Sequence, residues 1–172
     1  YLCKKYLFQN LLTFAAEKGI DTIMEGNNAD DLLIYRPGTQ AVKELGVLSP
    51  LAELGITKAQ VREIAVDMGL SCASRPSSPC LATRLPYGTP ISFELLARVD
   101  AGEQWLKEQG FPIVRLRVHG DILRIEIDKE RFSDFIAMAD KITAKMKELG
   151  FVYITLDAEG FRSGSMDVHI VK

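Results

Sequence analysis

The chain has 172 residues, of which 47% are hydrophobic and 26% are charged, and its formal net charge is −2. This composition is that of a globular protein with enough apolar surface for a core, in one domain or two small ones. A charge near zero gives no general attraction to nucleic acid or to an anionic membrane. Because no apolar run approaches the roughly 20 residues that span a bilayer, we expect neither a nucleic-acid nor a membrane partner.

Three cysteines, Cys3, Cys72 and Cys80, cannot all pair with one another, and their spacing matches no secreted disulfide framework. We therefore expect reduced thiols and a cytoplasmic location. The spacing also predicts no closed zinc site, and His119 and His169 are expected at the surface. The sequence opens without a methionine and runs directly into a helical pattern, which predicts a piece of a longer chain.

The first half of the chain has the pattern of an α/β layer structure. Hydrophobic periodicity and stop signals predict, in chain order, a helix over about 4–18, a buried parallel strand over 20–26, a short helix over 39–45 and a helix over about 57–68. The first helix carries Leu7, Leu11 and Phe14 at helical spacing. The last begins with a capping box of Thr57 and Gln60. A single strand is too little sheet for a complete domain.

Beyond the irregular segment 71–90, the second half of the chain has a different pattern of hydrophobic residues. The pattern predicts a helix over about 92–109, strands over 113–119 and 122–128 joined at Gly120-Asp121, a helix over about 130–149 and a strand over 151–156. This order predicts a small α+β sandwich with a three-stranded sheet. We therefore place the domain boundary between residues 90 and 91.

The hairpin has one apolar face and one charged face. Counting outward from a two-residue loop pairs Val118 with Leu123, Leu116 with Ile125, Val114 with Ile127, Arg115 with Glu126 and Arg117 with Arg124. Like charges directly opposite one another cost stability unless a negative group lies between them, and guanidinium groups bind phosphate and carboxylate well. We infer an anion site on the charged face. Arginines splayed into water are the alternative.

Two further segments carry polar or reactive side chains. Asn28, Asp30 and Asp31 follow the predicted strand, where they could hold Mg²⁺ or a nucleotide, or could only cap neighbouring helices. Cys80 lies in the segment PSSPCLATRLPYGTP, which is too rich in proline, serine and glycine for a helix or strand. Flexible backbone and the nearby Arg84 are conditions that expose a thiol and make it reactive.

Five segments resemble one known family. They are GNNADD, YRPG, SPL, PSSPCLATRLPYGTPI and LDAEGFRSGSM, and together they extend from the first residue almost to the last. They are similar to segments of the LarE family of ATP-dependent sacrificial sulfur transferases, within the PP-loop (N-type) ATP pyrophosphatase superfamily. The resemblance implies that residues 1–90 are the C-terminal part of a Rossmann-like, adenine nucleotide alpha hydrolase-like domain and that 91–172 form the small α+β domain.

The resemblance also implies a reaction. ATP, with Mg²⁺, would adenylylate a carboxylate of a pyridinium dicarboxylate mononucleotide, a precursor of the nickel-pincer cofactor, and a cysteine sulfur would then attack. In sacrificial members the donor becomes dehydroalanine, and its position falls on Cys80. The superfamily's SGGxDS phosphate loop is absent from this sequence, so we do not expect the chain as given to turn over ATP. A homo-oligomer is expected.

Other positions carry over from the family residue by residue. Asn28, Asp30 and Asp31 match its nucleotide-side element, with Asn27 in place of its Thr. Thr83, Arg84, Arg115, Arg117 and Arg162 match positions that bind phosphate or substrate, and Glu103 and Glu126 are expected as acidic partners or metal contacts. Some members instead hold a [4Fe–4S] cluster that carries the transferable sulfur, and then Cys3 and Cys80 would be ligands and Cys80 would not be sacrificed.

Two other functions stay open at the level of sequence. One is another sulfur-inserting PP-loop enzyme of the tRNA thiolase type, although the near-neutral charge and the lack of a basic, aromatic-rich surface argue against it. The other is a non-catalytic oligomeric module whose arginine face only holds anions at subunit contacts.

Overall fold

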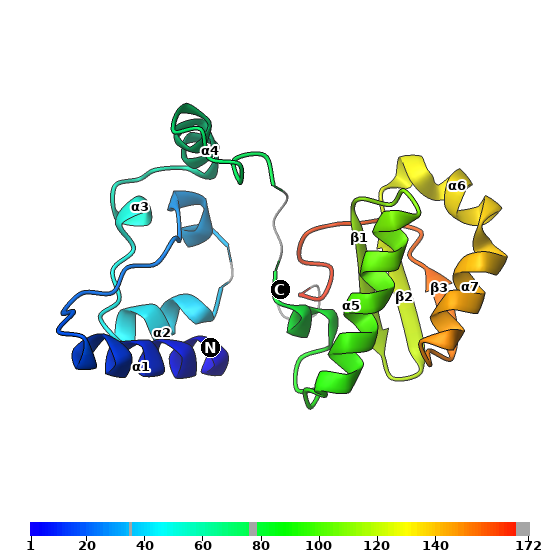
Figure 1. The fold of residues 1–172 in the computed structure, drawn as a ribbon, viewed down its shortest axis with the longest axis horizontal. Helices are drawn as coiled ribbons and strands as arrows, with labels where there is room; N and C mark the ends of the chain where they lie inside the picture. The colour runs from blue at the N-terminus through cyan, green and yellow to red at the C-terminus, as the bar shows by residue number, and fades with distance from the viewer. Residues whose placement is uncertain (35, 76–78, 168–172) are drawn as a thin grey trace. The chain divides into compact units, whose positions relative to one another are not determined.

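The chain forms two compact units, Tyr1–Ser77 and Ser78–Lys172 (Figure 1). The structure is a computed structural model and describes residues 1–34, 36–75 and 79–167, so that His169 lies outside the described residues. Within these ranges no helix is long and apolar enough to cross a membrane. The units divide earlier than the boundary drawn from sequence, because Leu81 and Leu85 pack with the core of the second unit.

The first unit consists of short helices around a small core. Its elements are α1 (Leu2–Glu17), the 3₁₀ helix η1 (Ala29–Leu32), α2 (Gly38–Glu44), α3 (Pro50–Glu53) and α4 (Lys58–Asp67). Phe8, Val42 and Val47 form the buried cluster. The capping box of α4 is confirmed, because Thr57 Oγ1 accepts a hydrogen bond from Gln60 N and Thr57 N donates to Gln60 Oε1.

The strand expected over 20–26 is not formed. The segment pairs with residue Leu48 through one isolated parallel bridge at Met24. Glu25 N donates to Leu48 O at 2.8 Å and Leu48 N donates to Ile23 O at 3.0 Å. The partner segment ends there, since α3 begins at Pro50, which has no N–H to extend a ladder.

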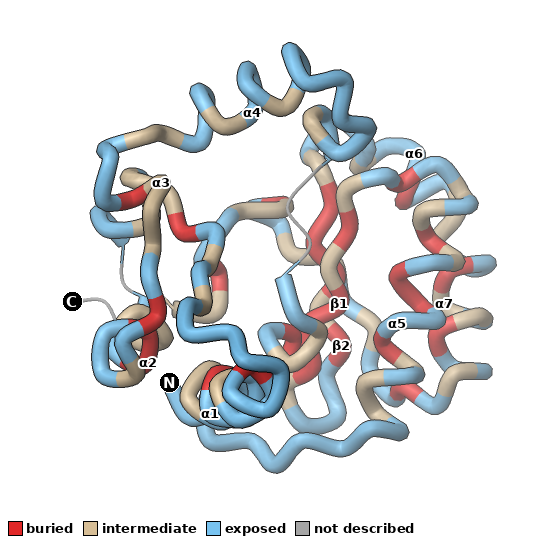
Figure 2. The backbone as a smooth tube through the Cα atoms, turned by 60° about the vertical axis from the view of Figure 1, so that its left-hand side comes forward, coloured by how far each residue is buried: buried red, intermediate tan, exposed pale blue. Residues whose placement is uncertain are grey.

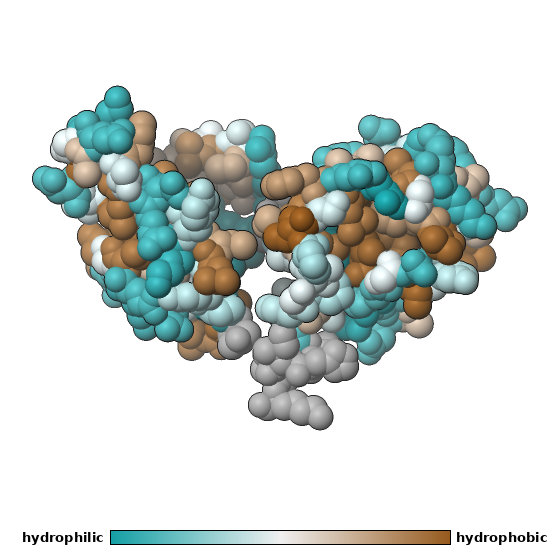
Figure 3. Space-filling model, turned by 90° about the horizontal axis from the view of Figure 1, so that it is seen from below, coloured by the Kyte–Doolittle hydropathy of each residue, from teal (hydrophilic) through white to brown (hydrophobic). Residues whose placement is uncertain are grey.

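The helices of the first unit keep much of their apolar surface exposed. In α1 the buried residues are Phe8 and Ala15, whereas Leu7 and Phe14 are 53% and 57% exposed. No residue of α4 is buried, and its tube is blue and tan throughout in Figure 2. Figure 3 shows such apolar side chains, in brown, at the surface among hydrophilic ones. Within the described residues of this unit, part of the amphipathic face of its helices is therefore exposed.

The second unit is the predicted α+β arrangement with a three-stranded sheet. Its elements are η2 (Leu81–Arg84), α5 (Phe93–Glu108), β1 (Val114–His119), β2 (Ile122–Ile127), η3 (Lys129–Arg131), α6 (Phe132–Ala137), α7 (Ala139–Glu148) and β3 (Tyr153–Leu156). The strand order is β1-β2-β3, with β1 antiparallel and β3 parallel to β2. The single helix expected over 130–149 is broken at Met138 into α6 and α7, and Phe135 of α6 and Ile142 of α7 both lie in the core.

The core of this unit lies between the apolar face of the sheet and its helices. The strand register is the predicted one at all five pairs. In Figure 2, α5 and α7 lie on the same side of β1 and β2, and they contribute Val99, Leu106 and Met146 to the core. Gly102 lets α5 approach closely, because a Cβ atom there would lie 2.5 Å from Leu116 Cδ1. The charged face of the hairpin is left for other contacts.

Candidate functional site

Cys80 is exposed at the start of η2. Its backbone oxygen accepts two hydrogen bonds from Thr83, from N at 3.0 Å and from Oγ1 at 2.7 Å. The turn that follows the cysteine is therefore fixed, while its side chain meets solvent. This is the arrangement that a nucleophilic thiol requires.

The Arg84 side chain connects the residues before and after Cys80 to α5. The residue is only 2% exposed, and its Nε and Nη2 donate to the two carboxylate oxygens of Glu103 at 2.7 and 2.9 Å. Its Nη1 donates to Thr83 Oγ1 at 2.9 Å and to Pro79 O at 3.3 Å. One guanidinium thus connects α5 to the residues on either side of Cys80.

Glu103 also covers the free edge of the sheet. Its Oε1 accepts a hydrogen bond from Leu116 N of β1 at 3.0 Å. Since β1 is an edge strand, this N–H has no strand partner on that side, and an unpaired buried N–H is costly. One carboxylate therefore joins α5, β1 and the Cys80 turn.

The charged face of the hairpin supplies its own negative group. Arg117 Nε and Arg124 Nη2 donate to different oxygens of Glu126, each at 3.1 Å. The Nη1 of Arg117 donates to Thr83 O at 2.9 Å, so this face is also attached to the Cys80 turn. Glu126 is 0% exposed and lies where the sequence required a negative group between the two arginines. An external anion on this face stays a prediction.

The segment after β3 packs along the same charged face. Ser165 Oγ donates to Glu126 Oε1 at 2.6 Å, and Arg124 Nη2 contacts Met166 Sδ at 3.5 Å. Asp157 Oδ2 lies 3.3 Å from Arg162 Nη1 in an ion pair, with the Arg162 side chain 33% exposed. Of the predicted phosphate-binding arginines in this unit, Arg162 is therefore among those with access to solvent.

Burial lowers the pKa of two arginines on this face. Burial lowers the pKa of Arg117, and the neighbouring Glu126 opposes this shift. Burial also lowers the pKa of Arg115, with a further contribution from the positive charge of Arg84. Arg115 Nη1 donates to Val114 O at 2.7 Å, and its guanidinium lies over the Phe161 ring, 5.3 Å from the centroid.

His119 ends the same face at the tip of the hairpin. Burial lowers its pKa below the ordinary 6.5, and the positive charge of Arg124 adds to the effect. Across the described residues, His119 Nε2 and Arg124 Nε are the buried side-chain polar atoms without a hydrogen-bond partner. The surface position expected for His119 is thus only partly correct, because its Nε2 is enclosed.

The polar cluster in the first unit makes local capping contacts. Asn28 Oδ1 accepts a hydrogen bond from Asp30 N at 3.0 Å, and Asp31 Oδ2 accepts one from Asn28 N at 3.1 Å. Asp30 Oδ2 accepts a hydrogen bond from Lys58 N at 2.8 Å and so caps the first turn of α4. Asp31 also forms an ion pair with Arg36. The capping alternative describes the three hydrogen bonds but not the ion pair with Arg36, and the predicted nucleotide contacts are not tested by them.

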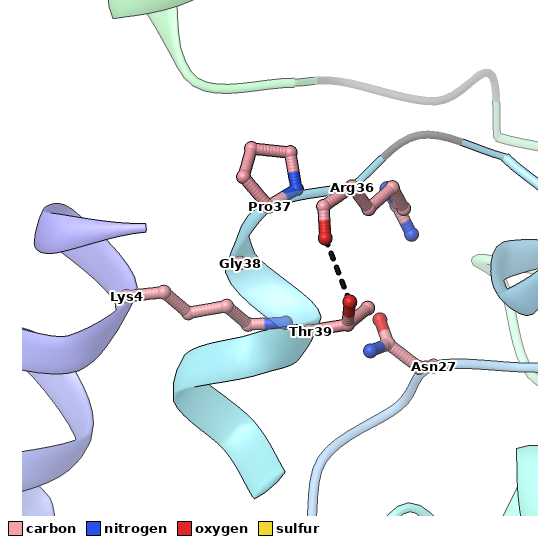
Figure 4. A pocket seen from close by; sticks show the side chains of 6 residues that line it. All are labelled: Lys4, Asn27, Arg36, Pro37, Gly38 and Thr39. Carbon is pink, nitrogen blue, oxygen red and sulfur yellow. Dashed lines mark hydrogen bonds between the residues drawn. The ribbon is translucent and has the colours of Figure 1, made fainter. Parts of the chain in front are cut away.

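A small pocket lies beside this cluster (Figure 4). Its volume is about 260 Å³, and it is lined by Lys4, Asn27, Arg36, Pro37, Gly38 and Thr39. Thr39 Oγ1 donates to Arg36 O at 2.7 Å, the contact that is dashed in Figure 4. The sequence analysis assigned no role to Lys4, Arg36 or Thr39, although the YRPG segment contains Arg36 and ends next to Thr39.

No metal site is preformed in the described part of the chain. No group of three or more His, Cys, Asp or Glu side chains gathers there. Cys3 is exposed on α1 of the first unit, and Cys80 belongs to the second. Glu103 and Glu126 both pair with arginines. The predicted Mg²⁺ and [4Fe–4S] contacts stay predictions.

Comparison with known proteins identifies relatives along the whole chain, although no model of a protein family matches it. An uncharacterized protein of Synechocystis sp. is 40% identical over all of this chain and 65% of its own length. Pyridinium-3,5-bisthiocarboxylic acid mononucleotide synthase of Lactiplantibacillus plantarum is 38% identical over all of this chain and 62% of its own length. An uncharacterized protein of Methanocaldococcus jannaschii is 32% identical over 95% of this chain and 64% of its own length.

The chain thus spans slightly less than two thirds of the length of these relatives. The similarity nevertheless extends over the whole of this chain for two of the relatives and over 95% of it for the third. This similarity over the whole chain supports the resemblance to the LarE family.

Proposed function

We propose that this chain is the sulfur-donating part of an ATP-dependent sulfur transferase that acts in nickel-pincer cofactor biosynthesis. The acceptor would be a carboxylate of a pyridinium dicarboxylate mononucleotide. The name of the L. plantarum relative supports this acceptor, since it describes the synthesis of a bisthiocarboxylic acid mononucleotide. The observation that carries the proposal is the exposed thiol of Cys80 on a turn whose two sides are held by Arg84.

The proposed chemistry has two steps. The Cys80 thiol loses its proton to solvent or a base and attacks the carbonyl carbon of an acyl adenylate, so that a C–S bond forms and AMP leaves with the electron pair. Removal of the Cα proton of residue 80 and cleavage of its Cβ–S bond then release the thiocarboxylate and leave dehydroalanine. The protein mainly positions the reacting groups and stabilises charge.

The remaining roles follow the family pattern. Thr83, Arg115, Arg117 and Arg162 would contact the phosphate of the acceptor. The nucleotide side would be formed by Asn28, Asp30 and Asp31, within residues 1–90 as part of a Rossmann-like PP-loop domain. ATP is a co-substrate in this scheme, and no step is assigned to Mg²⁺, because the carboxylates of Asp30 and Asp31 are engaged by Lys58 N and by Asn28 N and Arg36. We further propose a cytoplasmic homo-oligomer.

Mass spectrometry of the peptide that contains Cys80 tests the proposal. The full-length protein is incubated with ATP and acceptor, and loss of one H₂S from this peptide is the expected result. The Cys80→Ala variant is expected to abolish sulfur transfer while nucleotide binding and the fold are retained, because the side chain is exposed and packs little. Retained transfer would remove Cys80 from the donor role.

Other outcomes favour the alternatives. An intact Cys80 together with iron absorbance indicates the [4Fe–4S] mechanism with Cys3 and Cys80 as ligands. An intact Cys80, no iron and no release of AMP indicates the non-catalytic anion-binding module. Sulfur found in tRNA, and none in the mononucleotide, indicates a thiolase of the tRNA type.

A further inference from the structure

The turn that carries Cys80 is too short to hold its own shape. It is one turn of 3₁₀ helix, Leu81–Arg84, and its backbone hydrogen bonds join residues only three positions apart. Such single turns are weak by themselves. Leu81 and Leu85 pack with the core, and the side chains of Arg84 and Arg117 add the polar contacts that connect the turn to α5 and β1.

We infer that Arg84 and Glu103 are positioning residues: Glu103 holds the Arg84 guanidinium, which in turn fixes the residues on either side of the sulfur donor Cys80. This inference rests on the proposed function for the role of Cys80. It differs from the contacts that the family resemblance implies, in which Arg84 binds phosphate or substrate and Glu103 is an acidic partner or metal contact.

The hydrogen-bond inventory of the two side chains supports a positioning role. Arg84 uses Nε, Nη1 and Nη2 on protein acceptors. Glu103 accepts from Arg84 at both oxygens and from Leu116 N at Oε1. Each side chain is 3% exposed. A substrate phosphate or a metal ion would have to displace these bonds and leave a buried charge without its partner, which is costly.

Holding the turn is expected to keep the Cys80 thiol in the position that the attack requires. A thiol that attacks an activated carboxylate must lie close to the carbonyl carbon and in line with its approach, and a misplacement of about 1 Å costs up to about a hundredfold in rate. Arg84 bonds Pro79 O before the cysteine and Thr83 Oγ1 after it. A rigid planar fork that contacts both sides of Cys80 restricts the turn more than a single point contact does.

Two variants separate positioning from folding. Arg84→Lys keeps a positive charge beside Glu103 but lacks the planar fork that reaches Pro79 and Thr83 together. The double variant Arg84→Met with Glu103→Gln removes both buried charges at once, and its glutamine oxygen can still accept from Leu116 N. The exposed pair of Lys145 and Glu148 on α7 gives the matched control, Lys145→Met with Glu148→Gln.

The first measurement is hydrogen exchange on the full-length protein. In both test variants, exchange at the amides of Thr83 and Leu85 is expected to be at least about tenfold faster than in the control variant, the factor that loss of one hydrogen bond to a charged group gives. Exchange in β2 should stay unchanged. Unchanged exchange in the turn, or equal acceleration throughout the unit, overturns the inference.

The second measurement is the single-turnover rate of sulfur transfer as a function of acceptor concentration, because Cys80 is consumed in the proposed reaction. Loss of positioning is expected to lower the maximal rate constant about ten- to a hundredfold and to leave the acceptor concentration for half-maximal rate nearly unchanged, whereas loss of a direct substrate contact would raise that concentration. A raised half-saturating concentration with an unchanged maximal rate constant therefore overturns the inference. The rate at which iodoacetamide alkylates Cys80, relative to the exposed Cys72 in the same chain, should also change in the test variants and not in the control.

Failure of the proposed function has a different signature. Hydrogen exchange and alkylation of the turn need no reaction to occur. If the Cys80→Ala enzyme still transfers sulfur, the proposed function is wrong, while faster exchange in the variants would still show that Arg84 and Glu103 hold the turn.

Discussion

The two units of the chain contain similar amphipathic helices but differ in what those helices bury. Among the described residues, the core cluster of the second unit has fourteen buried apolar residues between its sheet and helices, and that of the first has three. In α7, Ile142 and Met146 are completely buried. In α1, Leu7 and Phe14 also share one helix face, two turns apart, and are more than half exposed.

This difference shows that periodicity predicts a helix and its apolar face, but not the partner of that face. The face of α7 meets a sheet whose inward side is apolar on every strand. Among the described residues, α1 packs against α2, a helix of seven residues, and Val47 and Ile23 join the small cluster around Phe8. Because most helical stability in proteins comes from packing an amphipathic face, we expect the two units to differ sharply in stability.

The largest expected difference concerns buried carboxylates. Glu126→Gln leaves the positive charges of Arg117 and Arg124 without their negative partner, and we expect a loss of about 3–5 kcal/mol in the free energy of unfolding. Glu25→Gln in the first unit should cost less, because the Lys4 side chain that pairs with Glu25 is 30% exposed and can be hydrated. Hydrogen exchange resolved by peptide measures both units in one experiment.

The control for this prediction is Glu130→Gln, which removes an exposed carboxylate from η3 in the same unit. It should leave exchange in β1 and β2 unchanged. If Glu126→Gln changed hydrogen exchange as little as Glu130→Gln does, the arginines of this face would be hydrated in solution rather than held by Glu126.

The next largest difference concerns apolar contacts. Leu116→Ala removes a side chain that is 0% exposed in the core of the second unit, and the expected loss is about 2–5 kcal/mol. Leu7→Ala on α1 removes a side chain that is 53% exposed, and the change should lie within about 0.5 kcal/mol. Urea unfolding followed by the fluorescence of Trp105, the single tryptophan, measures the second unit.

Hydrogen exchange in α1 measures the effect of Leu7→Ala in the first unit. An equal loss for the two leucines would mean that the exposed face of α1 is covered in solution. That outcome would remove the contrast between the units.

Local patterns account for the parts of the fold that were predicted correctly. The hairpin register followed from counting outward across a two-residue turn, and the start of α4 followed from the capping box of Thr57 and Gln60. Each depends on residues within about a dozen positions of one another. The strand expected over 20–26 failed for the opposite reason, because a parallel strand depends on a partner from elsewhere in the chain.

The contacts of the candidate site could not be predicted because they join distant or diagonal positions. Counting across the hairpin placed Glu126 opposite Arg115, but its carboxylate reaches Arg117 and Arg124. Arg84 and Glu103 are brought together by an irregular segment and a helix, for which no spacing rule exists. Cys80 could be singled out from its sequence context, but the side chains that fix its turn could not.

The smallest expected effect is a pH dependence that belongs to the second unit alone. Burial lowers the pKa of His119 below 6.5, with Arg124 and Arg117 adding to this shift and Glu126 opposing it. The unfolded state therefore binds the proton more tightly than the folded state does. Stability from the neutral imidazole is fully present above about pH 6.5 and is lost as the pH falls from that value toward the folded-state pKa.

His119→Gln should remove this fall of stability with falling pH, because glutamine does not titrate. The measurement is the midpoint of urea unfolding, followed by Trp105 fluorescence, at a series of pH values between about 5 and 7.5, the range in which a histidine titrates. A midpoint that falls equally with pH in the wild type and in His119→Gln would assign the slope to other groups. A midpoint that rises on acidification only in the wild type would mean that the folded unit prefers the charged imidazole, contrary to the enclosure of Nε2 beside two arginines.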